Sequence, residues 1–320
     1  MEEEKKLYPL KFVSLRDDYV WGSEEFKLAD LGYRDSFILE GWLASNTVSE
    51  LMDTYMDRVV GDKVYESYGR QFPLCVRCLK TSGRMPLRVS PEDELARERY
   101  DLLGKEKLWY VVSAGSDARI MMGFKKDTDA SELYSKCLDG TVEDILNVVS
   151  VHKGQVFRIA PGTPHAACGE VTIAEISQSS PLDFCLCTWG NEIGEDEFDS
   201  ALGLVDALDF IDYKAFRYVG PKGDVLVDLP QMRVERHNLS SKSLKVGAGD
   251  GFVLYVCLQG EASVLLDVQG QEASFRVSAL EAVLVPSECE DFRVVPSGED
   301  CIVLEATVPA TEPKDSYTGE

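Results

Sequence analysis

One histidine stands where it could bind a metal ion. Residues 158–170 read R-I-A-P-G-T-P-H-A-A-C-G-E, which is the pattern of a β-strand, a tight Pro-Gly turn and a second strand that carries His165. The chain has only two other histidines, His152 and His237, which are predicted to be a surface residue and a structural or exposed residue. A zinc site needs about three or four converging nitrogen, oxygen or sulfur ligands. His165 therefore requires partners from elsewhere in the chain.

The elements that would position these partners are mostly strands. Short apolar runs separated by turns follow residue 154 and recur from residue 225 onward, a pattern typical of all-β barrels and jelly rolls. Residues 153–161 and 280–287 occupy similar places in the two halves, which indicates two related barrels.

Helices are predicted only in short stretches. Apolar spacing predicts one from Ser49, and Ser90 is the predicted N-cap of another, which has Asp93 and Glu94 in its first turn. Two more are predicted between residues 127 and 149, the second over 141–149.

Composition excludes several classes of function. Acidic residues outnumber basic ones by 56 to 33, and the formal charge of −23 argues against nucleic-acid binding. No apolar run is long enough for a transmembrane helix, and the N-terminus has no apolar core of a secretory signal. Nine cysteines in such a chain predict reduced thiols and a cytoplasmic protein. Cys75 and Cys78 should point to opposite faces of one strand, so a metal knuckle is not expected there.

Several motifs occur together in one order along the chain. They are V-W-G, F-P-L-x-V, G-K-x-x-x-W-Y-V, G-T-V-E-D-I-L-N, K-G-x-V-F-x-I-x-P-G-T-x-H-A and A-E-I-x-Q-x-S. On these motifs the chain resembles the type I mannose-6-phosphate isomerases in their short bacterial form, from V-W-G to about residue 306.

The resemblance implies a mainly β fold of two tandem cupin (jelly-roll) barrels with a small helical portion. Residues 1–195 would form the first cupin with helical insertions, and 196–225 a helical or irregular connection. Residues 226–310 would form the second cupin, in which no metal site is expected, and 311–320 a disordered tail.

The resemblance also implies a reaction, the interconversion of mannose 6-phosphate and fructose 6-phosphate. A zinc ion in the first cupin would orient the sugar and stabilise the enediolate. His165 falls on the last of four zinc-ligand positions. The other three, which carry glutamine, histidine and glutamate in the family, are Arg88, Ser90 and Lys107. Two of the three replacements are cationic, so they repel a dication as well as failing to bind it.

Other pocket positions have changed too. Arg77 stands at a family lysine, Cys185 at an arginine implicated in catalysis, and Asn191 at a second arginine. The sequence therefore predicts a protein without zinc or another cofactor, catalytically silent or altered. Its pocket would hold a sugar, a sugar phosphate or another anion on Arg88 and Lys107, with Glu175 as a candidate partner for their charge.

Alternatives remain open at this stage. The chain could be an active zinc-dependent isomerase of carbohydrate metabolism, with Glu106 on a β-bulge replacing the lost glutamate. A rebuilt zinc site could use Cys168, Cys185 and Cys187. Arg88 and Lys107 could instead extend out of the pocket mouth into solvent. A silent subunit that pairs with an active homologue, and a homo-oligomer, are also left open.

Overall fold

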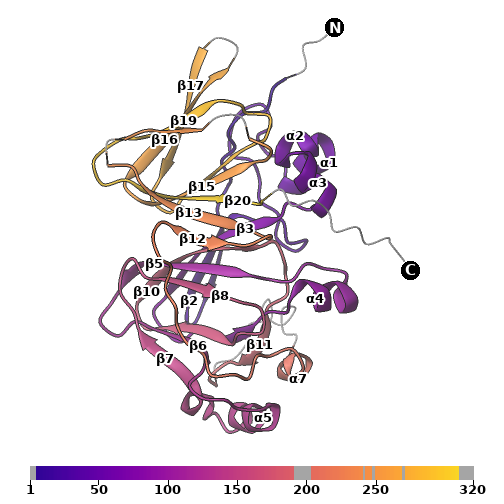
Figure 1. Cartoon of the computed structure of the whole chain (residues 1–320), viewed down its shortest axis with the longest axis vertical. Coiled ribbons are helices and arrows are strands. Elements are labelled where there is room, and N and C mark those ends of the chain that lie inside the picture. Colours follow the sequence, from indigo (N-terminus) through magenta and orange to yellow (C-terminus); the bar gives the residue numbers. More distant parts are fainter. Residues whose placement is uncertain (1–4, 191–202, 241, 247–248, 269–270, 310–320) are drawn as a thin grey trace.

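The computed structural model describes residues 5–190, 203–240, 242–246, 249–268 and 271–309, with only the backbone at residues 268 and 271. The chain is mainly β and forms two cupins, each made of two antiparallel sheets, one above the other in Figure 1. The predicted fold class is confirmed.

The first cupin consists of a six-stranded and a five-stranded sheet. The six-stranded sheet runs β1 (Leu15–Tyr19), β2 (Gly22–Leu28), β3 (Leu74–Thr81), β10 (Val171–Gln178), β5 (Lys107–Ala114), β8 (Val156–Ile159). The five-stranded sheet runs β11 (Phe184–Cys187), β4 (Leu87–Val89), β9 (His165–Cys168), β6 (Arg119–Phe124), β7 (Leu146–Ser150).

The second cupin repeats this plan with a five-stranded and a four-stranded sheet. One sheet runs β12 (Val225–Asp228), β13 (Arg233–Asn238), β20 (Ile302–Thr307), β15 (Val253–Gln259), β18 (Ala282–Val285). The other runs β14 (Leu244–Val246), β19 (Phe292–Pro296), β16 (Glu261–Val268), β17 (Gln271–Ser278).

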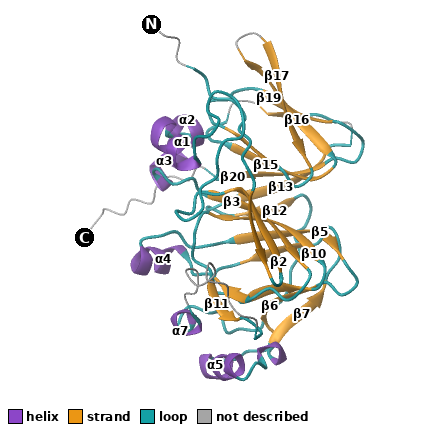
Figure 2. Cartoon of the chain, turned by 180° about the vertical axis from the view of Figure 1, so that it is seen from behind, coloured by secondary structure: helices purple, strands orange, loops and turns teal. Residues whose placement is uncertain are grey.

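The helices lie outside the sheets, as Figure 2 shows from behind. They are α1 (Val48–Tyr55), α2 (Asp57–Val60), α3 (Asp62–Tyr68), α4 (Asp93–Tyr100), α5 (Ala130–Leu138), the 3₁₀ turn η1 (Val142–Asp144) and α7 (Leu204–Ala207). None of the helices within the described ranges has the length and apolar character needed to traverse a bilayer.

Two helix predictions were wrong in detail. The helix predicted over 141–149 is only the turn η1, and the residues that follow form β7, which pairs with β6. Val148 and Val149, whose branched side chains suit a strand, lie in this pairing. Helix α4 begins later than predicted, with Glu92 at its N-cap, because the Ser90 hydroxyl donates to Asp183 instead.

The two cupins share one apolar core. Leu74, Val76 and Ile176 from the six-stranded sheet pack in the same cluster as Leu254 and Leu304 of the second cupin. On β10, Ala174 and Ile176 belong to this shared core, whereas Glu175 and Ser177 alternate with them and face the interior of the first cupin. Charged residues are thus directed inward because the outward face of this sheet is already occupied by apolar contacts.

Segments from the N-terminal half also reach the second cupin. Leu10 exchanges backbone hydrogen bonds of 2.7 and 2.9 Å with Leu284 of β18. Arg58 of α2 forms an ion pair of 3.0 Å with Glu288. The predicted domain boundary at residue 195 falls outside the described ranges, as does the predicted disordered tail.

Candidate functional site

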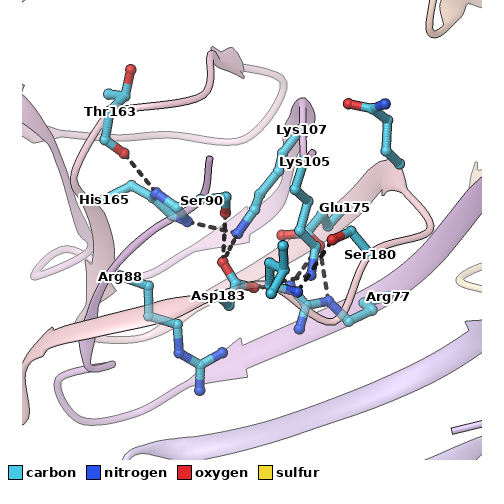
Figure 3. A network of polar contacts seen from close by, with 12 residues as sticks. Arg77, Arg88, Ser90, Lys105, Lys107, Thr163, His165, Glu175, Ser180 and Asp183 are labelled. Atoms are coloured by element: carbon cyan, nitrogen blue, oxygen red, sulfur yellow. Dashed lines mark hydrogen bonds and ion pairs between the residues drawn. The ribbon is translucent and has the colours of Figure 1, made fainter. Parts of the chain in front are cut away.

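The interior of the first cupin holds a buried network of charged side chains that come from both sheets (Figure 3). In the six-stranded sheet, Glu175 lies opposite both Arg77 of β3 and Trp109 of β5, and Ser177 lies opposite Lys107. In the facing sheet, Arg88 of β4 lies opposite His165 of β9. Antiparallel register therefore brings residues far apart in sequence into one small volume.

The centre of this network is an ammonium group. Nζ of Lys107 lies 2.9 Å from Nε2 of His165 and donates to Oδ1 of Asp183 at 2.5 Å. Nδ1 of His165 lies 2.9 Å from the carbonyl oxygen of Thr163. A carbonyl can only accept, so Nδ1 carries the proton, and Nε2 offers its lone pair to the ammonium.

Burial and charge fix the ionisation of this pair. Burial lowers the pKa of His165 to about 3, with the neighbouring Lys107 adding to the effect, so the imidazole is neutral. Burial also lowers the pKa of Lys107 to about 8, although Asp183 favours the charged form. At neutral pH the contact is therefore between an ammonium donor and a neutral imidazole acceptor.

Asp183 is the carboxylate that accepts the hydrogen bonds of the neighbouring lysines and serine. Its carboxylate accepts from Lys107, from Lys105 at 3.1 Å and from the hydroxyl of Ser90 at 2.8 Å. Burial would raise its pKa, but Lys105 and Lys107 hold the pKa well below the usual range.

The other half of the network is centred on Arg77. Its guanidinium approaches Glu175 at 2.7 Å and Glu24 at 3.0 Å, and Arg88 donates to Glu24 at 2.8 Å. Trp109 donates its indole N–H to Glu175 at 2.7 Å. Burial opposes the ionisation of Glu175, but Arg77, followed by Lys107, lowers its pKa to about 2.

These residues do not fit a zinc ion. Its nitrogen ligand would have to be Nε2 of His165, and that lone pair accepts from the Lys107 ammonium. Nearby, Ser90 and Arg88 supply a hydroxyl and a guanidinium where carboxylate, thiolate or imidazole would be needed. Within the described part of the chain no group of three or more histidine, cysteine, aspartate or glutamate side chains is arranged to hold a metal.

Three predicted site residues have ion-pair partners that differ from the predicted ones. Glu175, the candidate partner for Arg88 and Lys107, binds Arg77 and Trp109, whereas Arg88 binds Glu24 and Lys107 binds Asp183. Neither cation extends into solvent, since Lys107 is 1% exposed and the Arg88 side chain 11%.

The proposed substitute ligands lie elsewhere. Glu106 binds Arg158 at 2.8 Å on the opposite side of β5, as strand alternation requires. Cys185 lines a surface cavity of about 580 Å³ together with Cys137 and Cys187. All nine cysteines of the chain carry free thiols. Asn191 lies outside the described residues.

Sequence reasoning missed three members of the network. Asp183 follows the A-E-I-x-Q motif in the run S-S-P-L-D-F, where a lone acid in an apolar context was the available signal. Lys105 precedes Lys107 by two residues and so shares its strand face. Glu24 gave no signal that distinguished it from Glu25, because only the pairing of β2 with β3 shows which one faces inward.

Curated relatives and solved structures, but no family model, resemble this chain. A scan against models of known protein families matches none of them. Mannose-6-phosphate isomerase ManA of Bacillus subtilis is 26% identical over 206 residues, 58% of this chain and 63% of that protein. Mannose-6-phosphate isomerase of Streptococcus mutans is 29% identical over 189 residues, 55% of this chain and 59% of that protein. The chain thus spans less than two thirds of the length of these curated relatives.

Solved structures show the same fold over nearly the whole chain. The mannose 6-phosphate isomerase of Bacillus subtilis superposes with a TM-score of 0.78 over 94% of this chain and 100% of that one, at 15% identity. A point mutant of phosphomannose isomerase from Salmonella typhimurium gives 0.71 over 94% of this chain and 100% of that one, at 11% identity. The chain therefore resembles mannose-6-phosphate isomerases in sequence over part of its length and shares their fold over nearly all of it.

Proposed function

We propose that this chain is a zinc-independent member of the family, without the zinc-dependent interconversion of mannose 6-phosphate and fructose 6-phosphate. We propose further that its first cupin holds an anionic or polyhydroxy ligand. The observation that supports the proposal best is the 2.9 Å contact between Nζ of Lys107 and Nε2 of His165.

The physical reason is that an ammonium and a zinc ion need the same atoms. Both are cations that would bind the lone pair of His165 and the carboxylate of Asp183. Only one of them can occupy the space between these two groups. The ammonium belongs to the side chain of Lys107, so it is held at this position by a covalent bond to the chain. A dication entering beside it would meet Coulomb repulsion from Lys107 and from Lys105.

Loss of zinc also removes the Lewis acid that the family reaction needs. A lysine ammonium can donate a hydrogen bond to a sugar oxygen, but it cannot bind two oxygens of an enediolate as a metal does. His165 is fully buried and Lys107 is 1% exposed. A sugar phosphate therefore meets the guanidinium of Arg88, the most exposed of these cations, before it could reach the centre of the network.

Zinc retention tests the proposal directly. The full chain is loaded with excess zinc, desalted and analysed by metal spectroscopy, and fructose 6-phosphate formation is followed in a coupled assay. We expect much less than about one zinc per chain and no zinc-dependent turnover. About one zinc per chain with turnover that a chelator abolishes would instead establish the active isomerase.

A reversion variant sharpens this test. Lys107→Glu, combined with Ser90→His and Arg88→Gln, restores the ligand types that the family uses beside His165. We expect this variant to retain zinc where the unaltered chain does not. Lys80→Glu is the matched control, because Lys80 pairs with Glu25 at 3.2 Å outside the network. Circular dichroism establishes that both variants are folded.

A further inference from the structure

Strand β17 (Gln271–Ser278) is an open edge of the second cupin. It ends the sheet order β14-β19-β16-β17, so among the described strands it pairs only with β16. It lies at the outer end of the molecule, away from the first cupin, in Figure 1 and in Figure 2. It has eight residues, whereas the other described strands that end a sheet have three to five. A long edge strand is a template for pairing with another strand.

The hydrogen bonds at the end of β17 show how its backbone is oriented. The carbonyl of Glu261, the first residue of β16, accepts from the backbone N–H of Ser297 at 2.9 Å, so Glu261 faces β19 rather than β17. Ser278 lies opposite Glu261 and donates its backbone N–H to the carboxylate of Glu281 at 2.8 Å. Its carbonyl accepts from the backbone N–H of Glu281 at 2.9 Å. Ser278 therefore directs both backbone groups away from β16.

The alternation of an antiparallel strand extends this orientation along β17. The pairing with β16 has no register shift, and every second residue points its N–H and C=O to the same side. Glu272, Ser274 and Arg276 therefore also direct theirs to the open edge. Within the described part of the chain, no other segment pairs with these three residues. Their side chains are exposed, by 61% for Glu272 and 70% for Arg276.

The sequence of β17 is complementary to itself when two copies run antiparallel. A twofold axis at Ser274 places Glu272 of each copy opposite Arg276 of the other. Opposite charges across a strand pair are stabilising, whereas like charges are destabilising. The same register places Ala273 opposite Phe275, both of them half-buried on the inner face of the sheet. An axis at Glu272 or at Arg276 would place like charges opposite each other, and an axis at Ala273 or at Phe275 would leave both charges without a partner.

We propose that two copies of this chain associate through their β17 strands, antiparallel and centred on Ser274, so that one sheet continues across the dimer. About six backbone hydrogen bonds would join the copies, from the three residues of each strand that face the edge. The surface lies outside the charged network of the first cupin, so this inference is independent of the proposed function. An overlap of about five residues per copy is small for an interface, so we expect a dissociation constant between about 1 μM and 1 mM.

Sedimentation velocity of the full chain over a concentration series tests this proposal. We expect the weight-average sedimentation coefficient to rise with concentration and to fit an equilibrium between monomer and dimer. A chain that stays monomeric up to about 1 mM would overturn the proposal. An assembly larger than a dimer would also overturn it, because the twofold pairing of two β17 edges leaves neither edge open to a third copy.

Charge reversal on β17 identifies the interface. Glu272→Arg should weaken the dimer by at least about tenfold, because the new side chain lies opposite Arg276 of the second copy. Glu272→Arg combined with Arg276→Glu should restore the dimer, since the two charges exchange places. Within one chain these residues form surface ion pairs with Arg293 and Glu261, which contribute little to folding. Lys245→Glu is the matched control, because Lys245 is exposed on β14 at the other end of the same sheet, and it should leave the dimer unchanged.

A proline at the twofold axis provides a test that does not depend on charge. Ser274→Pro removes an N–H that faces the open edge rather than β16, a position at which an edge strand tolerates proline. We expect this variant to be monomeric, with circular dichroism establishing that it is folded. A dimer that persists in both Glu272→Arg and Ser274→Pro would locate the interface elsewhere and overturn the assignment to β17. A charge-exchange variant that stays monomeric would overturn the register centred on Ser274.

Discussion

At the scale of residues, the first cupin is distinguished by what bonds to His165. Zinc binding uses the imidazole lone pair, and so does the donor contact from Lys107. The protonated Nδ1 is held by the carbonyl of Thr163, so the ring keeps the tautomer and orientation that a metal ligand would need. The contact from Lys107 therefore leaves the histidine in a geometry suited to a metal ligand and occupies the lone pair that a metal would need.

The buried carboxylates predict how stability depends on pH. The pKa of Glu175 is lowered to about 2, so it contributes stability above its unfolded pKa that is lost as pH falls from about 4.5 to 2. Glu175→Gln should reduce the loss of unfolding free energy between pH 4.5 and pH 2, here called the acid limb, by up to about 3 kcal/mol. Chemical unfolding measured across that pH range checks the effect.

The pKa of Asp30 is shifted in the opposite direction to that of Glu175, so its effect on the pH dependence of stability has the opposite sign. Burial raises the pKa of Asp30 to about 6, and its carboxylate accepts from the backbone N–H of Phe72 at 2.8 Å. A raised pKa gives stability that is lost as pH rises from about 4 to 6. Asp30→Asn should remove this loss and leave the acid limb unchanged. If both variants changed the same limb, the assignment of these pKa shifts would be wrong.

At the scale of elements, the alternation along β10 determines what the site can contain. Its outward residues Ala174 and Ile176 pack in the apolar core shared with the second cupin, and its inward residues include Glu175 and Ser177. A shift by one residue would put charge into the shared core and apolar side chains into the site. The register of this strand thus positions the carboxylate of Glu175 opposite Arg77 and the hydroxyl of Ser177 opposite Lys107.

The corner between α2 and α3 is an element that only glycine can form. Gly61 has φ of +88°, and a Cβ there would lie 2.3 Å from the carbonyl oxygen of Asp250 in the second cupin. Gly61→Ala should destabilise the chain by roughly 2–4 kcal/mol through strain and this backbone clash. The measurement is the free energy of unfolding in denaturant.

Gly69 provides the control for this change. It has φ of +61°, but a Cβ there would meet nothing within 4 Å. Gly69→Ala should cost only the conformational part, about 1 kcal/mol. Equal losses in the two variants would show that the contact with Asp250 contributes nothing.

At the scale of the whole molecule, the shared core predicts that the two cupins unfold together. Leu304→Ala in the shared core and Val294→Ala in the core of the second cupin, both fully buried sites, should each lower the melting temperature of one common transition. Calorimetry checks this, since the calorimetric and van't Hoff enthalpies should agree. Two separate transitions, with Val294→Ala affecting only one, would contradict it.

The order of the motifs and the strand pattern were enough to predict the resemblance to mannose-6-phosphate isomerases and the mainly β architecture. They also predicted that His165 is the one residue that matches the four zinc-ligand positions of that family. These follow from local patterns and from residue chemistry at matched positions, neither of which needs coordinates. The sequence also identified Arg77, Arg88, Lys107 and Glu175 as polar residues in an unusual place.

How these charges pair depends on the folded arrangement of the two sheets. Asp183, Glu24 and Lys105 reach the network through antiparallel register and through the facing of two sheets, and such contacts join residues up to 106 positions apart. Sequence distance carries no information about which carboxylate approaches which cation. The contact between the Lys107 ammonium and His165, which come from facing sheets, is therefore visible only when both sheets are in place.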